Sequence, residues 1–502
     1  MNFTDFLLQG ARRHPDAVAI VEGDRPIRFD ALEHGVLAVE AALRDAGLGP
    51  GTVVGLASKH VSVHLILTLA VARLGGTTMP MPSGPTLAER LAPLRRAGAA
   101  VLIGERTMRD GEDAAFEGLR YIAADESLLA GRTSAKPGAR GEDVGDRPWR
   151  LTATSGTTGA PKLIAISHER ALTLYMLQQG FLPFGGPGTR LFCAIGLDVP
   201  FGLNHCLRQL MFGGAVVAYS DRIDEAIDVC ERHAVTHLIA SPSTASRWLA
   251  RLPDSGPRLP AMRVYLGGGA VSPALRDALS RRLSPRVGVL YGASEYGGVA
   301  VADEHTLAEH PDSVGRVLPW LQVEAIDGQG RPVPPGDVGE IRVQGLAGFP
   351  GYHDDPAATA ASLRDGWFHP GDLGRVTPDG LLFIDGRVDD VINVGGIKVL
   401  PARIEAVLEA HPDVAEAAAF AASGPDGTQV LLAAVVCRGL FDEAALLAHC
   451  RAQLGAMAPQ RLKRLQALPR NASGKLVRRI LSDGIRLERP PAAAPAPPGA
   501  PA

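Results

Sequence analysis

The sequence predicts an α/β fold, with a large N-terminal domain of layered, mostly parallel sheets and helices and a small α+β C-terminal domain. Short apolar runs rich in β-branched residues alternate with amphipathic stretches, and several runs end in Gly or Ser. Such runs are typical of parallel strands that helices cover on both faces. The pattern changes after about residue 380, and a chain of 502 residues is too long for one ordinary domain.

The elements of the large domain follow from this hydrophobic pattern. Short runs of Val, Ile and Leu predict buried strands over residues 52–58, 100–104, 214–220, 236–242, 262–269 and 287–292. The amphipathic stretches between them predict helices over residues 65–75, 223–234 and 272–283. Parallel sheets usually bind their ligands at the carboxyl ends of the strands, so the Gly and Ser residues there mark the expected site.

The last quarter of the chain predicts a separate small domain. Residues 380–396 form short strands and turns, and beyond them we expect a helix over 401–410, a strand over 430–437 and a helix over 443–454. We therefore divide the chain into a large domain, a small domain and a tail, with limits at residues 1–386, 387–486 and 487–502. The tail is a Pro/Ala sequence of low complexity, and we expect it to be disordered because it has nothing to bury.

Composition disfavours several classes of protein. The 51 basic and 54 acidic residues give a net charge of −3, which argues against nucleic-acid binding through bulk charge, and 5% aromatic residues leave few stacking platforms. The five cysteines contain no C-x-x-C pair, which is typical of thiols in a reducing compartment. The longest apolar run, residues 61–72, is too short to span a bilayer. A cytoplasmic protein with no membrane and no nucleic-acid partner is expected.

The stretch TSGTTGAPK, residues 154–162, is the strongest candidate for a phosphate-binding loop. Its glycines allow a tight turn that presents backbone N–H groups, while the hydroxyls and the lysine add donors and positive charge. It is not the P-loop pattern, because Pro161 precedes the lysine and Leu163 follows it. The candidate residues are Thr154, Ser155, Gly156, Thr157, Thr158, Gly159 and Lys162.

Five further stretches place polar residues on turns flanked by glycine. They are YLGGGAVSP (265–273), YGASEYGG (291–298), GWFHPGDLGRVTPDG (366–380), DGRVDDVINVGGIKVLPARIE (385–405) and PRNASGKLVRR (469–479). In this order, together with TSGTTGAPK, they resemble the AMP-forming adenylate ligases of the ANL superfamily: acyl-CoA synthetases, luciferases and the adenylation domains of peptide synthetases. The resemblance covers residues 3–479, nearly the whole chain.

This resemblance implies an ATP site and a role for each matching residue. The loop at 154–162 would hold the β- and γ-phosphates, Tyr291 would stack on adenine, and Asp372 would bond both ribose hydroxyls. Arg387 would contact the ribose or a phosphate. The remaining residues of the implied nucleotide site are Gly268, Gly269 and Ala270 in the wall between adenine and the acyl pocket, and Gly292 beside the stacking tyrosine.

The resemblance also implies the groups that act on the reacting phosphate. Ser294 stands where the family usually has Thr, and either residue offers a hydroxyl to the α-phosphate. Glu295 would bind Mg²⁺, a hard cation that prefers anionic oxygen. Lys475 would span the reacting carboxylate and the α-phosphate, and with Ser294 and Arg387 it completes the expected catalytic set. Asp389 lies where the family has its hinge.

The chemistry of such a ligase explains these residue types. Attack of a carboxylate on the α-phosphate of ATP brings two anions together, so the site must supply positive charge from Lys475, Lys162 and Mg²⁺. A thiol then attacks the acyl-adenylate and AMP leaves. Because Lys475 is needed only in the first step, we expect the small domain to be mobile and to rotate about the hinge.

The acid and its acceptor remain open at the level of sequence. The acyl pocket is expected between residues 193 and 299, with candidate residues Asp198, Phe201, His205, Gly267 and Val299. Asp198 either reads an amino group or, more simply, is a turn or capping residue. No carrier domain follows the small domain in this sequence, so the acceptor is expected to be coenzyme A or a separate carrier, and we favour coenzyme A. A separate phosphopantetheinyl carrier protein, loaded with an acyl or amino acid, is the alternative, and a non-catalytic scaffold is disfavoured.

Overall fold

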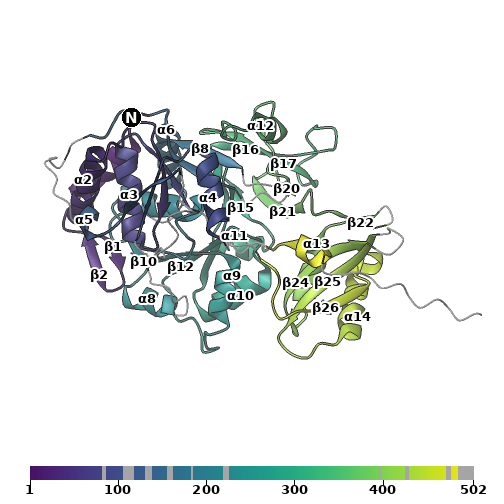
Figure 1. The fold of residues 1–502 in the computed structure, drawn as a ribbon. Coiled ribbons are helices and arrows are strands. Elements are labelled where there is room, and N and C mark those ends of the chain that lie inside the picture. The colour runs from purple at the N-terminus through teal and green to yellow at the C-terminus, as the bar shows by residue number, and fades with distance from the viewer. Residues whose placement is uncertain are drawn as a thin grey trace, which may run out of the picture.

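The computed structural model describes residues 1–81, 86–105, 118–129, 138, 140–154, 162–182, 185–218, 225–394, 397–423, 429–470 and 476–483. The chain forms a larger body, coloured purple to green in Figure 1, and a smaller yellow-green body formed by its C-terminal part. The larger body contains two sheets, and both contribute to the candidate site.

The first sheet has six strands in the order β6-β5-β3-β4-β7-β8. Its strands are β3 (Val53–Ala57), β4 (Thr77–Pro80), β5 (Val101–Gly104), β6 (Arg120–Ala123), β7 (Pro148–Ala153) and β8 (Leu163–Ser167). All neighbours are parallel except β7 and β8, which form a hairpin. The two described ends of the stretch TSGTTGAPK, Thr154 and Lys162, follow β7 and precede β8, and β8 is an edge strand of this sheet.

The second sheet has fifteen strands and changes character along its width. Its parallel part contains β1 (Val18–Glu22), β9 (Arg190–Cys193), β10 (Ala215–Ala218), β11 (His237–Ala240), β12 (Arg263–Gly267) and β13 (Arg286–Ala293). Beyond β13 the sheet continues with antiparallel strands, which the sequence pattern did not predict. These are β14 (Gly297–Ala302), β15 (Gly315–Val317), β16 (Leu321–Ile326), β17 (Gly339–Gly345), β18 (Leu363–Arg364), β19 (Trp367–Phe368), β20 (Asp372–Val376) and β21 (Leu381–Arg387), while β2 (Arg25–Arg28) pairs with β1 at the other edge.

The helices of the larger body cover these sheets and begin at recognisable caps. Ser167 and Ser272 accept hydrogen bonds at the start of α6 and α10, and Thr86 forms a capping box with Glu89 at α4. The helices are α1 (Phe3–Arg13), α2 (Phe29–Asp45), α3 (Val61–Arg73), α4 (Leu87–Arg96), α5 (Glu126–Leu129), α6 (His168–Gln179), α7 (Pro200–Met211), α8 (Ala226–Arg232), α9 (Pro242–Leu249), α10 (Pro273–Arg282), α11 (Glu304–Glu309) and α12 (Pro356–Ser362).

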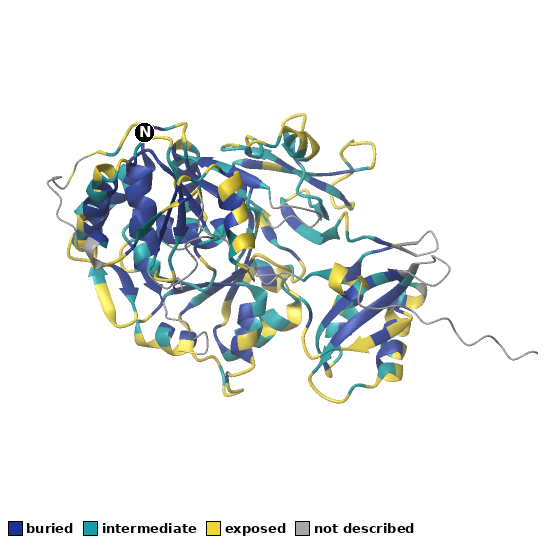
Figure 2. Cartoon of the chain, in the orientation of Figure 1, coloured by how far each residue is buried: buried dark blue, intermediate teal, exposed yellow. Residues whose placement is uncertain are grey.

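One hydrophobic core joins the two sheets of the larger body. It contains Leu65 and Leu69 of α3, Ile164 of β8, Leu207 of α7 and Ile341 of β17, all fully buried. Burying a side chain of this size stabilises the fold by roughly 1.5–3 kcal/mol. The dark blue residues in Figure 2 concentrate on the strands and on the helices packed against them. The parts of the two sheets that carry the candidate site, the β13–β14 turn and the β7–β8 hairpin, are therefore held in a fixed relation.

The C-terminal part forms its own sheet and its own core. The sheet consists of β24 (Val414–Ser423), β25 (Gln429–Cys437) and β26 (Arg461–Arg464), and it packs against α13 (Pro401–Glu409) and α14 (Glu443–Leu454). Helix α15 (Arg478–Asp483) lies beside β24. A hairpin of β22 (Ile392–Val394) and β23 (Ile397–Val399) precedes α13 in the chain. A short 3₁₀ turn, Gly455–Met457, follows α14. The predicted fold class, with a large N-terminal sheet domain and a smaller C-terminal one, is confirmed, while the limits at residues 386 and 486 stay predictions.

Candidate active site

The turn between β13 and β14 is the centre of the candidate site. Tyr291 lies near the end of β13, and Ser294 and Glu295 lie in the turn that follows. Gly292 allows this turn because a Cβ there would lie 2.1 Å from the carbonyl oxygen of Gly297. No side chain fits in that space, so the turn and the orientation of Glu295 depend on this glycine.

Asp372 is held by two donors from different strands. Tyr291 Oη donates to Asp372 Oδ2 at 2.5 Å, and Arg387 Nη1 donates to Oδ1 at 2.8 Å. The register of β20 against β21 places Asp372 directly opposite Arg387. Burial and the neighbouring carboxylate raise the pKa of Tyr291 well above its usual value, so its hydroxyl stays protonated and acts as a donor. The structure thus brings together the three residues expected at the ribose and adenine.

Glu295 is buried and is held from two sides. Tyr352 Oη donates to Glu295 Oε1 at 2.8 Å. Arg170 of α6 donates through Nη2 to the backbone carbonyl of Glu295 and through Nε to the carbonyl of Ala347 at 3.0 Å. Burial lowers the pKa of Arg170 to about 10, and the guanidinium remains charged at neutral pH. These contacts fix both the backbone and the carboxylate of Glu295.

The described part of the phosphate loop lies close to Glu295. Thr154 N–H donates to the carbonyl of Lys162 at 2.8 Å, which closes the base of the loop. The Lys162 ammonium lies 4.7 Å from the centre of the Tyr352 ring. The remaining candidates of this loop, from Ser155 to Gly159, lie outside the described residues. Tyr352 therefore contacts two predicted site residues that come from different sheets.

The expected acyl pocket residues lie around the start of α7. The rings of Phe201 and His205 pack edge to face at 4.7 Å, and a Cβ at Gly267 would lie 2.7 Å from the Phe201 ring. His205 Nδ1 lies 2.7 Å from the Phe201 carbonyl, and burial lowers the pKa of His205 to about 3, so the imidazole is neutral. Val299 is buried in the main core, on β14. Phe201 and His205 thus form a wall against Gly267 at the end of β12, whereas Val299 belongs to a different cluster.

Asp198 lies in the short turn that precedes α7. Its Oδ1 would be 2.2 Å from a Cβ at Gly196, so the carboxylate lies over its own turn. Arg150 of β7 anchors this turn, because its Nη2 donates to the carbonyls of Leu197 at 3.0 Å and Asp198 at 3.1 Å. Burial lowers the pKa of Arg150 to about 10. The arginine connects the strand that leads to the phosphate loop with the start of the acyl wall.

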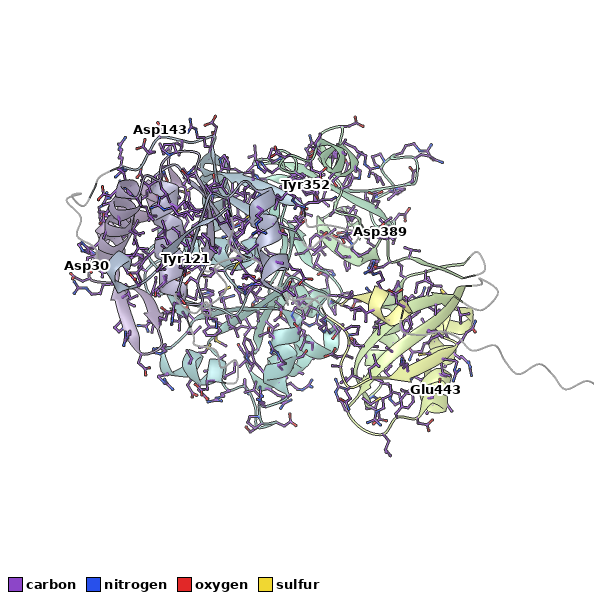
Figure 3. The ribbon with its side chains drawn as sticks, viewed as in Figure 1. Asp30, Tyr121, Asp143, Tyr352, Asp389 and Glu443 are labelled. Atoms are coloured by element: carbon purple, nitrogen blue, oxygen red, sulfur yellow. The ribbon has the colours of Figure 1, made fainter. Side chains whose placement is uncertain are left out.

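The other predicted residues lie at the rim of the site or outside the described ranges. Gly268, Gly269 and Ala270 form an exposed bend directly after β12. Asp389 is exposed in the turn between β21 and β22, where Figure 3 shows the ribbon passing to the C-terminal body. Lys475 lies outside the described residues, although its flanks, Arg470 and Leu476, pair with each other.

Sequence reasoning missed three residues of this arrangement: Arg150, Arg170 and Tyr352. Arg150 gives a detectable signal, since a basic residue inside a buried strand needs a partner. Arg170 lies in the first turn of α6, a helix with little hydrophobic periodicity, and Tyr352 lies in an irregular loop, so neither has a periodic or glycine-flanked pattern. Their importance follows only from contacts across the two sheets.

The fold and this site define an adenylate-forming enzyme. The model of a family described as AMP-binding enzyme matches residues 7–353, and that of the AMP-binding enzyme C-terminal domain matches residues 403–475. Since the first match covers more than half of the chain, the protein belongs to the AMP-binding enzyme family.

Curated relatives and solved structures match more than nine-tenths of the chain. Feruloyl-CoA synthase of Amycolatopsis sp. is 30% identical over 486 residues, which cover 93% of this chain and 96% of that protein. The fatty acid–[acyl-carrier-protein] ligase ScoC of Streptomyces coeruleorubidus is 28% identical and covers 94% of each. The o-succinylbenzoate CoA synthetase MenE of Bacillus subtilis, solved with its acyl-adenylate intermediate OSB-AMP, superposes with a TM-score of 0.85 at 25% identity, covering 97% of this chain and 99% of that one.

These findings confirm the predicted resemblance to the AMP-forming adenylate ligases and the predicted enzyme class, an AMP-forming acid–thiol ligase. In the described ranges, no helix is long and apolar enough to cross a membrane. No group of three or more His, Cys, Asp or Glu residues that could hold a metal ion occurs in the same part of the chain. The roles of individual residues stay predictions.

Proposed function

We propose that this ligase activates an apolar carboxylic acid with ATP and transfers the acyl group to coenzyme A. The observation that carries the proposal is the arrangement at the end of β13. There Tyr291 donates to Asp372. Glu295, four residues after Tyr291, accepts from Tyr352, whose ring lies next to Lys162. A nucleoside group on the first carboxylate and a polyphosphate between Glu295 and Lys162 fit this spacing.

The residues of the chain divide the work between binding and reaction. Asp372 accepts from the ribose hydroxyls, because each carboxylate oxygen keeps a lone pair beyond its bond to Tyr291 or Arg387. Lys162 and the N–H groups of its loop hold the phosphates that leave. Lys475 carries positive charge to the reacting carboxylate and α-phosphate, and removing one such donor typically costs about 2.7–4 kcal/mol of barrier.

A magnesium ion fits this set of residues if it arrives with ATP. Glu295 is a single, buried and oriented carboxylate, and Mg²⁺ is commonly held by one or two carboxylates together with substrate phosphates. When bound, the ion would neutralise the phosphate oxygens. The chain's own part is to keep the Glu295 carboxylate in place, through Tyr352 and Arg170.

An apolar acid is favoured over an amino acid. The wall formed by Phe201 and Gly267 belongs to an apolar cluster with Tyr265 and Leu290. Asp198, the residue that the sequence suggested for binding an amino group, lies over its own turn at Gly196. This placement supports its interpretation as a turn residue, so we expect fatty or aromatic acids to be the substrates.

Coenzyme A is the favoured acceptor, and a phosphopantetheinyl carrier protein is the alternative. Feruloyl-CoA synthase and MenE, to which the chain is similar, are named for coenzyme A products, whereas ScoC is named for a carrier protein. Either acceptor presents the same thiol group. We expect the two to differ in the surface that surrounds the site rather than in the groups that act on the phosphate.

A pyrophosphate-release screen tests the proposal. Fatty, aromatic and amino acids would be supplied with ATP and Mg²⁺, each with and without coenzyme A. We expect release with apolar acids and free acyl-CoA as the product. Turnover only with a phosphopantetheinyl carrier would establish the alternative acceptor. Release only with amino acids would overturn the assignment of an apolar substrate.

A further inference from the structure

Tyr352 occupies a position that no role in the proposed reaction explains. It follows β17 in an irregular loop, yet it pairs with Ile164 of β8, and the next residue, His353, donates to the carbonyl of Leu163 at 2.7 Å. The loop therefore crosses from the fifteen-stranded sheet to the six-stranded sheet. Figure 3 labels Tyr352 in this upper part of the larger body.

The loop that carries Tyr352 is anchored at several points. Arg170 donates to the carbonyl of Ala347, and the backbone of Phe349 hydrogen-bonds to the hydroxyl of Tyr296. Tyr352 N–H donates to Thr359 Oγ1 at 2.9 Å. Since these anchors lie on α6, the β13–β14 turn and α12, the tyrosine is fixed relative to both sheets.

The phenol hydroxyl of Tyr352 faces Glu295. It donates to Oε1 at 2.8 Å, and the side chain of Ser362 hydrogen-bonds to the same phenol group. Burial and the carboxylate raise the pKa of Tyr352 above its usual value, so the phenol stays protonated throughout the physiological range. One oxygen of Glu295 is thereby held, and among the described residues the other has no hydrogen-bond partner, so it can accept from a ligand.

The ring of the same tyrosine faces Lys162. An ammonium 4.7 Å from a ring centre lies within the range of a cation–π interaction. Lys162 ends the phosphate loop and has no acidic partner among the ion pairs of the described residues. The aromatic face can therefore orient the ammonium without neutralising it, which leaves its full charge for a phosphate.

We propose that Tyr352 is a positioning residue that sets the distance between the metal-binding carboxylate and the phosphate-binding lysine. The hydroxyl orients Glu295, and the ring orients Lys162. This inference rests on the proposed function, since it assumes that ATP and Mg²⁺ bind between these two groups. It predicts that the two halves of the tyrosine contribute separately: the hydroxyl to the metal, and the ring to the phosphates.

Two substitutions separate these contributions. Tyr352→Phe keeps the ring and removes the hydroxyl, while Tyr352→Leu removes both. The readout is the affinity for ATP, measured by calorimetry in the absence of acid, with Mg²⁺ and with EDTA. We expect Tyr352→Phe to lower the affinity about 10- to 150-fold with Mg²⁺ only, the range for one hydrogen bond to a charged group. Tyr352→Leu should lower it in EDTA as well, by about 3-fold or more.

Further variants exclude a general effect on folding. Tyr121→Phe removes a phenol hydroxyl that donates to the carbonyl of Gly104 at 2.8 Å in the six-stranded sheet, and it should leave both affinities unchanged. In a Glu295→Gln background, Tyr352→Phe should have little additional effect on the Mg²⁺-dependent affinity, since its partner is already altered. A thermal melt of each variant checks that the proteins are folded.

The outcomes distinguish this inference from the proposed function. Suppose that the unmodified protein binds ATP more tightly with Mg²⁺ than with EDTA. If both affinities of both Tyr352 variants then lie within twofold of those of the unmodified protein, the inference is wrong and the function stands. Equal losses for Tyr352→Phe with Mg²⁺ and with EDTA would also overturn it, because they would indicate a structural role alone. If the unmodified protein binds no ATP, the proposed function fails first.

Discussion

Replacing Asp372 by Asn removes the charge at the proposed ribose site with little change of shape. In the structure both carboxylate oxygens accept, from Tyr291 Oη at 2.5 Å and from Arg387 Nη1 at 2.8 Å. An amide offers one acceptor oxygen, and its NH₂ group would face one of the two donors, the Tyr291 hydroxyl or the Arg387 guanidinium. Asp372→Asn therefore weakens the existing pair and the bonds that ribose hydroxyls would make.

The expected loss of ATP affinity follows from those bonds. A hydrogen bond to a charged group contributes about 1.5–3 kcal/mol, so two ribose bonds correspond to a decrease of roughly 10²- to 10⁴-fold. The effect on stability should be smaller, because the Arg387 side chain is 42% exposed and solvent screens its ion pair. Calorimetric titration with ATP measures the first quantity, and urea unfolding measures the second.

A matched control lies on the same two strands. Arg375 of β20 donates to Asp385 of β21 at 3.0 Å, in a pair of similar geometry to that of Arg387 and Asp372. Asp385→Asn should leave the affinity for ATP within about twofold of the unmodified protein. If Asp372→Asn also remained within about threefold, the assignment of Asp372 to the ribose would be refuted.

Three further predictions test other parts of the chain. Lys475→Ala should abolish pyrophosphate release while sparing thioester formation from supplied acyl-adenylate, and equal loss of both would contradict the hinge assignment. Arg150→Met should raise the KM for the acid about tenfold and the KM for ATP much less, because it frees the carbonyls of Leu197 and Asp198 beside the acyl wall. Steady-state kinetics with each substrate varied in turn measures both constants, and an equal rise in the two would contradict this prediction. Burial raises the pKa of Glu409 to about 7 from 4.5, so the folded state binds this proton more tightly than the unfolded state does. The free energy of unfolding should therefore fall as pH rises from about 4.5 to 7, by at most about 3 kcal/mol. Urea unfolding across this range should show the fall in the unmodified protein and a flatter profile in Glu409→Gln.

The sequence predicted those parts of the fold that local pattern controls. The buried parallel strands, such as β11 and β12, are short runs of apolar residues between turns, and α14 matches its predicted limits, residues 443–454. Strand β24 was missed because its sequence, VAEAAAFAAS, is rich in alanine, which favours helices when it is read locally. Its pairing with β25 and its burial under α13 override that propensity, and neither is visible in a single sequence.

The candidate site was predictable to the extent that it lies on turns with glycine. Tyr291, Glu295, Asp372 and Lys162 all lie in such stretches, and the structure brings them together as two clusters. The pairing of Asp372 with Arg387 follows from the register of β20 and β21, which no local pattern specifies. Arg170 and Tyr352 act across the two sheets, so only the packed structure reveals them.

The two carboxylates of the site share one arrangement: each accepts from a tyrosine hydroxyl, Asp372 from Tyr291 and Glu295 from Tyr352. In both tyrosines the pKa is raised by burial first and by the carboxylate second, so neither phenol loses its proton near neutral pH. At Glu295 the phenol orients the carboxylate without cancelling its charge, whereas Asp372 also accepts from the guanidinium of Arg387. The acids are thus positioned before ligands arrive, and little reorganisation is needed when the phosphates and the ribose bind. Because a neutral donor preserves the negative charge at Glu295, the proposed reaction would draw its positive charge from other groups, and Lys162, Lys475 and the metal are the proposed sources.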